Sequence, residues 1–311
     1  MKLLGSTHLI FLAVTLLFLG LTSWAVRKMP RKWQNVMFAL AAFLCAAGIF
    51  FRFAMGMRFD GGIRLRPLLV QMLQVCNFNF LLLPLCLIPK CKFLRQYAIF
   101  FSMVAASTAL FSPSGDFANL PWNSVTILSS WFNHTFAVAC PLWMMASGRE
   151  TPVRKYVLPT AIGVVVYFTV AYGMIELLMA NGILPAGSSF SFIYEAKGIP
   201  FLGPLHEAIG VPYFYLYPMI PLLVAYLYMF ESLFVRPVYI LYHGGEGKIR
   251  RLFAPIGATV RLPKEEITKD GHVFLGYSTK RSATSAKYPP GSLYIIPGHT
   301  TTLHAVWRKD E

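Results

Sequence analysis

Two residues of this sequence have the types that a nucleophile and its base require, and both lie inside apolar segments. His134 is near the middle of "SSWFNHTFAVACPLWMM" (residues 129–145), and Cys76 lies in "QMLQVCNFNFLLLPLCL" (residues 71–87). Apolar surroundings raise the pKa of a thiol, so a cysteine nucleophile needs a base close to it. A histidine from a neighbouring helix would supply that base. The alternative is that Cys76 packs as a small apolar residue and that His134 hydrogen-bonds between helices.

Polar residues recur at helical spacing around both positions. In the segment of His134 they follow at intervals of three, four and four, which predicts one polar stripe: Asn123, Thr126, Ser130 and His134. In the segment of Cys76 the spacing predicts two polar faces: Gln71, Gln74 and Asn77 on one, with Cys76, Asn79 and Leu83 on the other. Lipid-facing helices avoid such residues, so these faces are expected to line the bundle interior or a cavity. The predicted substrate-binding residues are Gln74, Asn77, Asn79, Ser130 and His8. For the glutamine and asparagine residues, simple hydrogen bonding between helices is the alternative.

The elements that must position these residues are predicted to be transmembrane helices. Of the 311 residues, 56% are apolar and only 13% are charged, more apolar than a soluble globular protein requires. A hydrocarbon core of roughly 30 Å needs about 20 apolar residues per helix. Seven segments qualify: 9–25, 36–55, 68–88, 97–111, 124–146, 156–179 and 213–234. We therefore predict an all-α polytopic domain of seven transmembrane helices over residues 1–235.

The charge distribution predicts the orientation of this domain. Basic residues gather in alternate short loops: Arg27, Lys28, Arg31 and Lys32; Lys90, Lys92 and Arg95; Arg149, Arg154 and Lys155. The positive-inside rule places these loops in the cytoplasm, with the N-terminus outside the cell membrane and the C-terminal domain inside. The loop with Arg58, Arg64 and Arg66 opposes the trend. The net charge of +15 is explained by anionic lipid headgroups, so membrane lipids and not nucleic acid are the expected partners.

Cysteine spacing excludes two further kinds of site. The five cysteines lie in or beside apolar segments without any CxxC pair: Cys45, Cys76, Cys86, Cys91 and Cys140. Neither a disulfide framework nor a zinc site is indicated, and no metal or diffusible cofactor is expected.

After residue 235 the composition changes to short β-branched and aromatic runs between turn residues. "VYILYH", "GATVRLP", "HVFLGYST", "SLYIIP" and "TTLHAVW" predict strands of a small β domain over residues 236–311. With "YHGGEG" and "YPPGSLYII", their order resembles the Listeria/Bacteroides repeat, a β-grasp-like module, over residues 238–307. Tyr277 and His304 stand where that family usually has Trp and Tyr. The resemblance implies partner binding or scaffolding on a cell surface, which conflicts with the cytoplasmic placement.

The membrane region, from His8 to about Pro221, resembles the YwaF-type integral membrane proteins, which are related to a eukaryotic acyltransferase of ether-phospholipid remodelling. The stretches that carry the resemblance are "STHLIFL", "LQVCNFNFLLLPLCL", "SSWFNHTFAV" and "FLGP". The Ser-His of the family's fifth helix corresponds to Asn133-His134. The family's third helix keeps its cysteine as Cys76, but its Pro is Met72 and its His is Gln74. If that His activates the thiol in relatives, the activity here is expected to be weak, altered or absent.

The resemblance implies that Cys76 attacks a lipid ester and His134 moves the proton. The acyl-thioester then passes to a hydroxyl or to water, with Gln74 or Asn79 as the oxyanion donor. The alternative function is non-catalytic: a seven-helix receptor, transporter or scaffold whose β module binds a protein partner.

Overall fold

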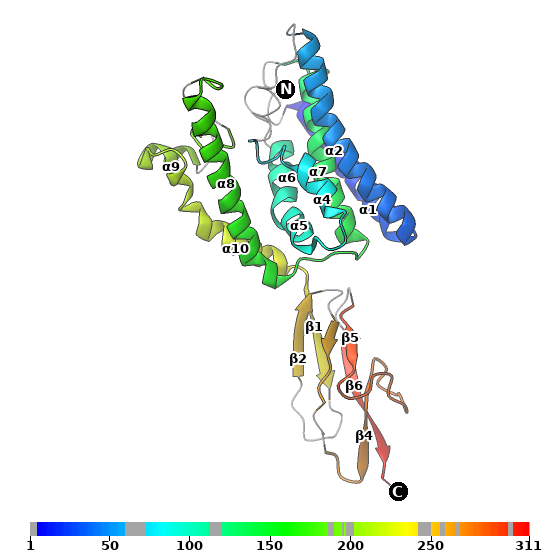
Figure 1. Ribbon diagram of the computed structural model, residues 1–311. Helices are drawn as coiled ribbons and strands as arrows, with labels where there is room; N and C mark the ends of the chain where they lie inside the picture. Colours follow the sequence, from blue (N-terminus) through cyan, green and yellow to red (C-terminus); the bar gives the residue numbers. More distant parts are fainter. Residues whose placement is uncertain are drawn as a thin grey trace. The chain divides into compact units, whose positions relative to one another are not determined.

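The computed structural model describes residues 5–59, 73–111, 120–185, 190–194, 196, 202–241, 250–255, 259–264, 268–297 and 301–310. The chain divides into two compact units. The first comprises Met1–Glu150 with Arg154–Tyr228, and the second comprises Thr151–Val153 with Met229–Glu311. The first unit is helical and the second is mainly β-sheet (Figure 1).

The helices of the first unit are α1 (Ser6–Lys28), α2 (Arg31–Phe59), α4 (Asn79–Cys86), α5 (Lys92–Tyr97), α6 (Met103–Phe111), α7 (Val125–Ala146), α8 (Val157–Ala180) and α9 (Leu202–Ile209). Helix α10 (Met219–Ser232) crosses the boundary between the units. A π-helical turn, Ala98–Ser102, joins α5 to α6, and short 3-10 turns lie at Arg154–Tyr156 and Phe214–Leu216.

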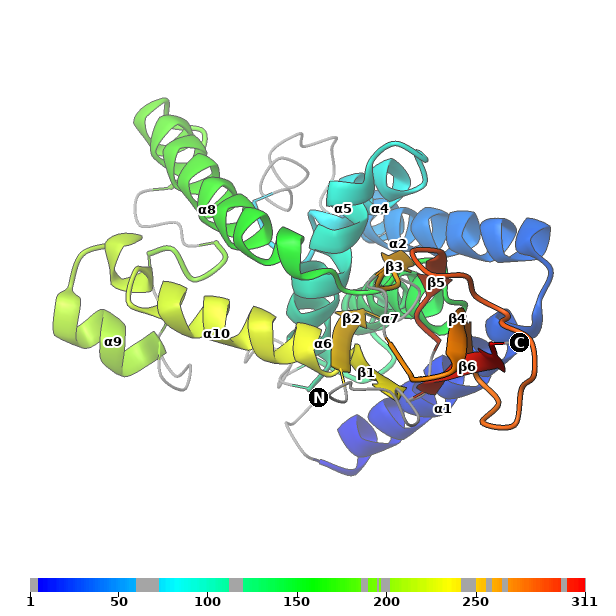
Figure 2. The same ribbon diagram turned by 90° about the horizontal axis from the view of Figure 1, so that it is seen from below.

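Helix α7 is the centre of the first unit. Fourteen of its 22 residues are buried, and α1, α2, α4 and α6 pack around it (Figures 1 and 2). Its first turn is fixed by Ser124, whose Oγ accepts a hydrogen bond from the Ile127 N–H at 3.3 Å. The apolar core of the unit gathers on this helix, with Ala137, Cys140 and Trp143 at most 1% exposed. A helix so enclosed can carry polar side chains that lipid would not tolerate.

Helices α2 and α7 pack closely at Gly48. A Cβ placed on Gly48 would lie 3.3 Å from the Asn133 Cβ and 3.3 Å from the Phe132 ring. Three residues earlier on α2, the Cys45 thiol donates a hydrogen bond to Asn133 Oδ1 at 2.9 Å. The absence of a side chain at Gly48 thus brings α2 near enough to Asn133 for this polar contact to form.

Four helical stretches of the described residues are long and apolar enough to cross a membrane: Ser6–Lys28, Arg31–Phe51, Lys92–Phe111 and Arg154–Ala180. They correspond to the first, second, fourth and sixth predicted segments. Helix α7 has the required length, but its polar residues lower its hydropathy. The last predicted segment contains the 14-residue helix α10. A total of seven spans stays a prediction.

Residues 68–88, the third predicted segment, do not form the single long helix that was expected. Residues 68–72 lie outside the described residues, residues 73–78 form turns, and α4 has only eight residues. The prediction of a continuous helix is therefore wrong over residues 73–78. Apolar composition does not distinguish a buried turn from a helix, because either can be enclosed by the bundle.

The second unit contains a mixed four-stranded sheet and a two-stranded ribbon. The strands are β1 (Val235–Leu241), β2 (Arg250–Pro255), β3 (Thr259–Arg261), β4 (His272–Ser278), β5 (Leu293–Ile295) and β6 (Thr301–Lys309). The sheet order is β2-β1-β6-β4, with β1 and β6 parallel and the other neighbours antiparallel, while β3 pairs with β5. All five predicted strand segments contain a strand, and the sequence analysis missed β2.

Strand β4 bends at Gly276, where its pairing with β6 is irregular. This glycine has φ +129°, and a Cβ there would lie 2.4 Å from the Tyr288 carbonyl oxygen, so that no other residue fits. The bend places the next residue, Tyr277, in the core with no exposed surface. Its hydroxyl donates a hydrogen bond to the Pro263 carbonyl at 3.3 Å.

Replacing Gly48 with Leu is expected to lower the free energy of unfolding by about 1–3 kcal/mol, because the new side chain overpacks the α2–α7 contact. Thermal unfolding in lipid nanodiscs measures the loss. Gly173→Leu is the matched control, since no atom lies within 4 Å of a Cβ at Gly173. Equal stability of the two variants would contradict the close contact of α2 with α7.

Candidate functional site

Cys76 lies in the turns before α4 and is partly exposed. Because residues 73–78 are not helical, their backbone groups need other partners. Asn79, the first residue of α4, donates from Nδ2 to the Cys76 carbonyl at 2.9 Å and is completely buried. The side chain that spacing placed on a helical face with Cys76 instead fixes the backbone of that residue.

Ser191 holds the same turn from a distant part of the chain. Its Oγ donates to the Leu73 carbonyl at 2.7 Å and accepts from the Val75 N–H at 2.8 Å. Its own N–H donates to Gln74 Oε1 at 3.3 Å. Ser191 is buried and has φ +51°, a left-handed conformation that is uncommon for residues other than glycine.

Helix α8 also contacts the turn that contains Cys76. The Tyr167 ring of α8 lies 5.3 Å from the Phe78 ring. Ser191 was not predicted, because its contacts are with residues more than 110 positions earlier and no local pattern signals them.

His134 has a defined ring orientation in α7. Its Nδ1 lies 2.6 Å from the Ser130 carbonyl oxygen and 3.4 Å from the Ser130 hydroxyl. A carbonyl only accepts, so Nδ1 carries the proton and donates it to Ser130. This tautomer leaves Nε2 as the basic nitrogen, and Nε2 is buried.

The thiol of Cys76 and the imidazole of His134 are near enough to interact electrostatically. Because Nδ1 is committed to the Ser130 carbonyl, the nitrogen available to the thiol is Nε2. The two residues lie in different elements, Cys76 in a turn and His134 in the central helix, and their pairing as a catalytic site stays a prediction. The arrangement has the elements of an activated cysteine: a thiol, a base, and a group that orients the base.

A chain of amides lies beside this pair. Asn133 donates from Nδ2 to Asn77 Oδ1 at 3.2 Å, and the same oxygen accepts a long contact from the Cys76 thiol at 4.0 Å. The Cys45 thiol completes the chain by donating to Asn133. Asn77 and Asn133 are both buried, so the network ties α2 and α7 to the turn of Cys76.

The two predicted oxyanion donors have different roles. The amide nitrogen of Asn79 is committed to the Cys76 carbonyl. Gln74 uses its side-chain oxygen to accept from Ser191, which leaves its NH₂ group as a hydrogen-bond donor two residues from the thiol. Between these two residues, the hydrogen bonds favour Gln74.

His8 contacts other residues. Its Nε2 lies 2.9 Å from the Leu110 carbonyl oxygen, and its ring packs edge-on against Trp131 at 5.8 Å. These contacts join the start of α1 to α6 and α7. They identify a structural role for His8, and its substrate-binding role stays a prediction.

Within the described part of the chain, no group of three or more His, Cys, Asp or Glu residues could hold a metal ion. All five cysteines are free, and only Cys76 and Cys91 are partly exposed. Among these five, Cys76 is the one that interacts electrostatically with a histidine of the described residues.

The fold and this site define a helical membrane protein whose central helix carries a histidine near the cysteine of a neighbouring turn. Residues 3–230 match the model of the TMEM164 family, so the chain belongs to that family of membrane proteins. Comparison with curated proteins gives no match, and comparison with solved structures gives none either.

Ser191→Ala is expected to lower the free energy of unfolding by about 1–3 kcal/mol, because two buried backbone groups lose their partner. Hydrogen exchange at the Val75 amide should rise at the same time. Ser147→Ala is the control, since the Ser147 hydroxyl bonds only within its own turn, to the Met144 carbonyl at 3.1 Å. Unchanged hydrogen exchange at Val75 would contradict the role of the Ser191 hydroxyl in holding this turn.

Proposed function

We propose that this protein is an intramembrane enzyme that transfers or hydrolyses a lipid acyl group, with Cys76 as the nucleophile and His134 as the general base. The observation that carries the proposal is the proximity of the Cys76 thiol to an imidazole whose Nδ1 is fixed by the Ser130 carbonyl. A histidine that served packing alone would not need to meet a partly exposed thiol.

The first half-reaction forms a thioester. His134 Nε2 takes the thiol proton, and the Cys76 sulfur attacks the carbonyl carbon of a lipid ester. The ester C–O bond breaks, and the leaving alkoxide takes the proton from the imidazolium. The products are an acyl group on Cys76 and a lipid hydroxyl, and His134 is neutral again.

The second half-reaction releases the acyl group. A hydroxyl of the acceptor, or water, gives its proton to Nε2, and its oxygen attacks the thioester carbonyl. The C–S bond breaks, and the Cys76 thiolate regains the proton from His134. The cycle involves no oxidation or reduction, and its proton transfers use the same nitrogen in both directions.

Gln74 stands where the YwaF-type pattern has a histidine, but its side chain fits another role in this cycle. Its oxygen anchors the turn by accepting from the Ser191 N–H. The proposal assigns its NH₂ group to the oxyanion that develops on the ester carbonyl. The base is supplied by α7, so the mechanism requires no second histidine.

The proposal includes the arrangement in the membrane. Seven spans over residues 1–235 would place the N-terminus outside the cell and a β-grasp-like module, residues 236–311, in the cytoplasm. The basic loops support this orientation, with Arg27 and Lys28 ending α1 and Arg149 following α7.

A second candidate function is partner binding by the β unit. Leu293 and Ile295 of β5 are 61% and 66% exposed, and they lie on the same face of the strand. Exposed apolar residues on a short ribbon are typical of protein contact surfaces. A non-catalytic scaffold, receptor or transporter would use this surface without acyl chemistry at Cys76.

In membranes treated with an alkyne-tagged fatty-acyl phospholipid, the chain is expected to carry a hydroxylamine-sensitive acyl adduct. Cys76→Ala should abolish the adduct. His134→Ala should slow its formation by about 10²- to 10⁴-fold, the range for loss of a general base. In-gel fluorescence after coupling of a dye to the alkyne measures both effects.

Cys91→Ala is the matched control, because Cys91 is also partly exposed. Labelling that persists in Cys76→Ala, or its absence from the folded wild-type chain, would overturn the enzymatic proposal in favour of the scaffold.

Ser130→Ala is expected to retain most of the labelling rate, because the main-chain carbonyl of Ser130 orients His134 at 2.6 Å and the hydroxyl is more distant at 3.4 Å. The rate is followed over time in the same adduct assay. A loss as large as that of His134→Ala would show that the hydroxyl is the required group.

A further inference from the structure

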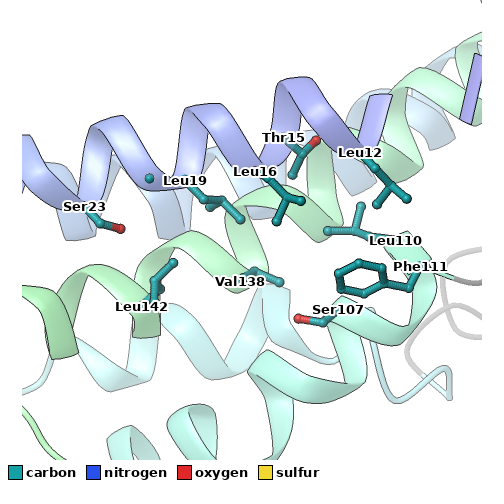
Figure 3. A pocket seen from close by; sticks show the side chains of 11 residues that line it. Leu12, Thr15, Leu16, Leu19, Ser23, Ser107, Leu110, Phe111, Val138 and Leu142 are labelled. Carbon is teal, nitrogen blue, oxygen red and sulfur yellow. The ribbon is translucent and has the colours of Figure 1, made fainter. Parts of the chain in front are cut away.

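A groove of about 430 Å³ runs along α1 and is closed by α6 and α7 (Figure 3). Side chains of α1, among them Leu16 and Leu19, face Val138 and Leu142 of α7. The wall from α6 is formed by Ser107, Leu110 and Phe111. The lining is almost entirely aliphatic or aromatic carbon.

The groove lies along a helix that is apolar enough to span the bilayer. The open space on α1 arises at Gly20, where a Cβ would have no atom within 4 Å. From Leu12 to Ser23 the groove extends about 16 Å along the helix. Lipid acyl chains are the long apolar molecules available in such surroundings.

A hydroxyl group and then a positive charge follow the apolar wall of the groove toward the C-terminal end of α1. Ser23 lines the groove, and its hydroxyl oxygen is buried with no hydrogen-bond partner among the described residues. Arg27, one helical turn further, shares that face of α1 and is exposed. Residues 1–59 contain no acidic side chain, and in the described part of the chain Arg27 forms no ion pair.

We propose that this groove binds one acyl chain of an anionic phospholipid. The chain lies against Leu12, Leu16 and Leu19, the ester carbonyl accepts from the Ser23 hydroxyl, and the phosphate lies at Arg27. The order of apolar wall, hydroxyl donor and cation along α1 matches the order of acyl chain, ester and phosphate in the lipid. The proposal is independent of acyl transfer, since none of these residues contacts Cys76 in the arrangement described above.

The test uses the full chain in phosphatidylcholine nanodiscs that contain a small fraction of phosphatidylglycerol with a diazirine in its acyl chain. After illumination, peptide mapping is expected to find the lipid on residues 12–23 and 107–111. Gly20→Phe should abolish this labelling, because its ring fills the groove. Ser107→Phe fills the groove from the opposite wall and should have the same effect.

Gly173→Phe is the control for a bulky side chain, since Gly173 on α8 also has open space around it. Arg27→Gln should lower the preference for phosphatidylglycerol over a diazirine-labelled phosphatidylcholine about fivefold, the effect of one positive charge near the membrane surface. Lys28→Gln is its control, because the Lys28 ammonium lies over the Trp24 ring at 3.8 Å.

Labelling spread evenly over the outer faces of α1 and α8, or unchanged in both groove-filling variants, would overturn the proposal in favour of non-specific lipid contact. Groove labelling with equal efficiency by the two lipids would overturn the role of Arg27.

Discussion

Polar side chains of α7 must find partners inside the protein, because a bilayer offers none, and this requirement determines how the first unit packs. The two tryptophans of α7 illustrate it. Trp131 donates to the Thr15 hydroxyl at 2.7 Å and Trp143 to the Thr22 hydroxyl at 2.9 Å, which sets the register of α1 against α7. On the side of α7 that faces α2, Asn133 Oδ1 accepts a hydrogen bond from the Cys45 thiol. Each bond requires a close neighbour, so the enclosure of α7 follows from its own sequence.

The same requirement explains the turn that holds Cys76. A helix would satisfy its backbone internally, but a turn at this depth exposes donors and acceptors that need partners. Asn79 and Ser191 provide them, and Ser191 adopts a left-handed backbone conformation to do so. Strain of this kind persists where surrounding contacts enforce it.

The sequence predicted the parts of this site that depend on helical periodicity. Ser130 and His134 are four residues apart, and in α7 they share a hydrogen bond as the spacing required. Thiol chemistry gave a reason to pair Cys76 with His134, but the sequence could not show that the two residues meet. The turn at 73–78 and Ser191 were not predictable, because periodicity reports on local structure and their contacts join distant segments. Strand β2 was missed for a local reason, since Arg250 and Arg251 interrupt its apolar pattern.

Helix α7 contributes residues both to the candidate site and to the groove along α1. His134 faces Cys76, and Val138, four residues later, lines the groove beside α1. Residues four apart are rotated by about 40° around a helix, so the two positions lie on neighbouring faces of one rigid element. A lipid seated along α1 would press on the face next to the histidine. Occupancy of the groove would therefore stabilise the position of α7, and through it the distance between the base and the thiol, without touching either residue.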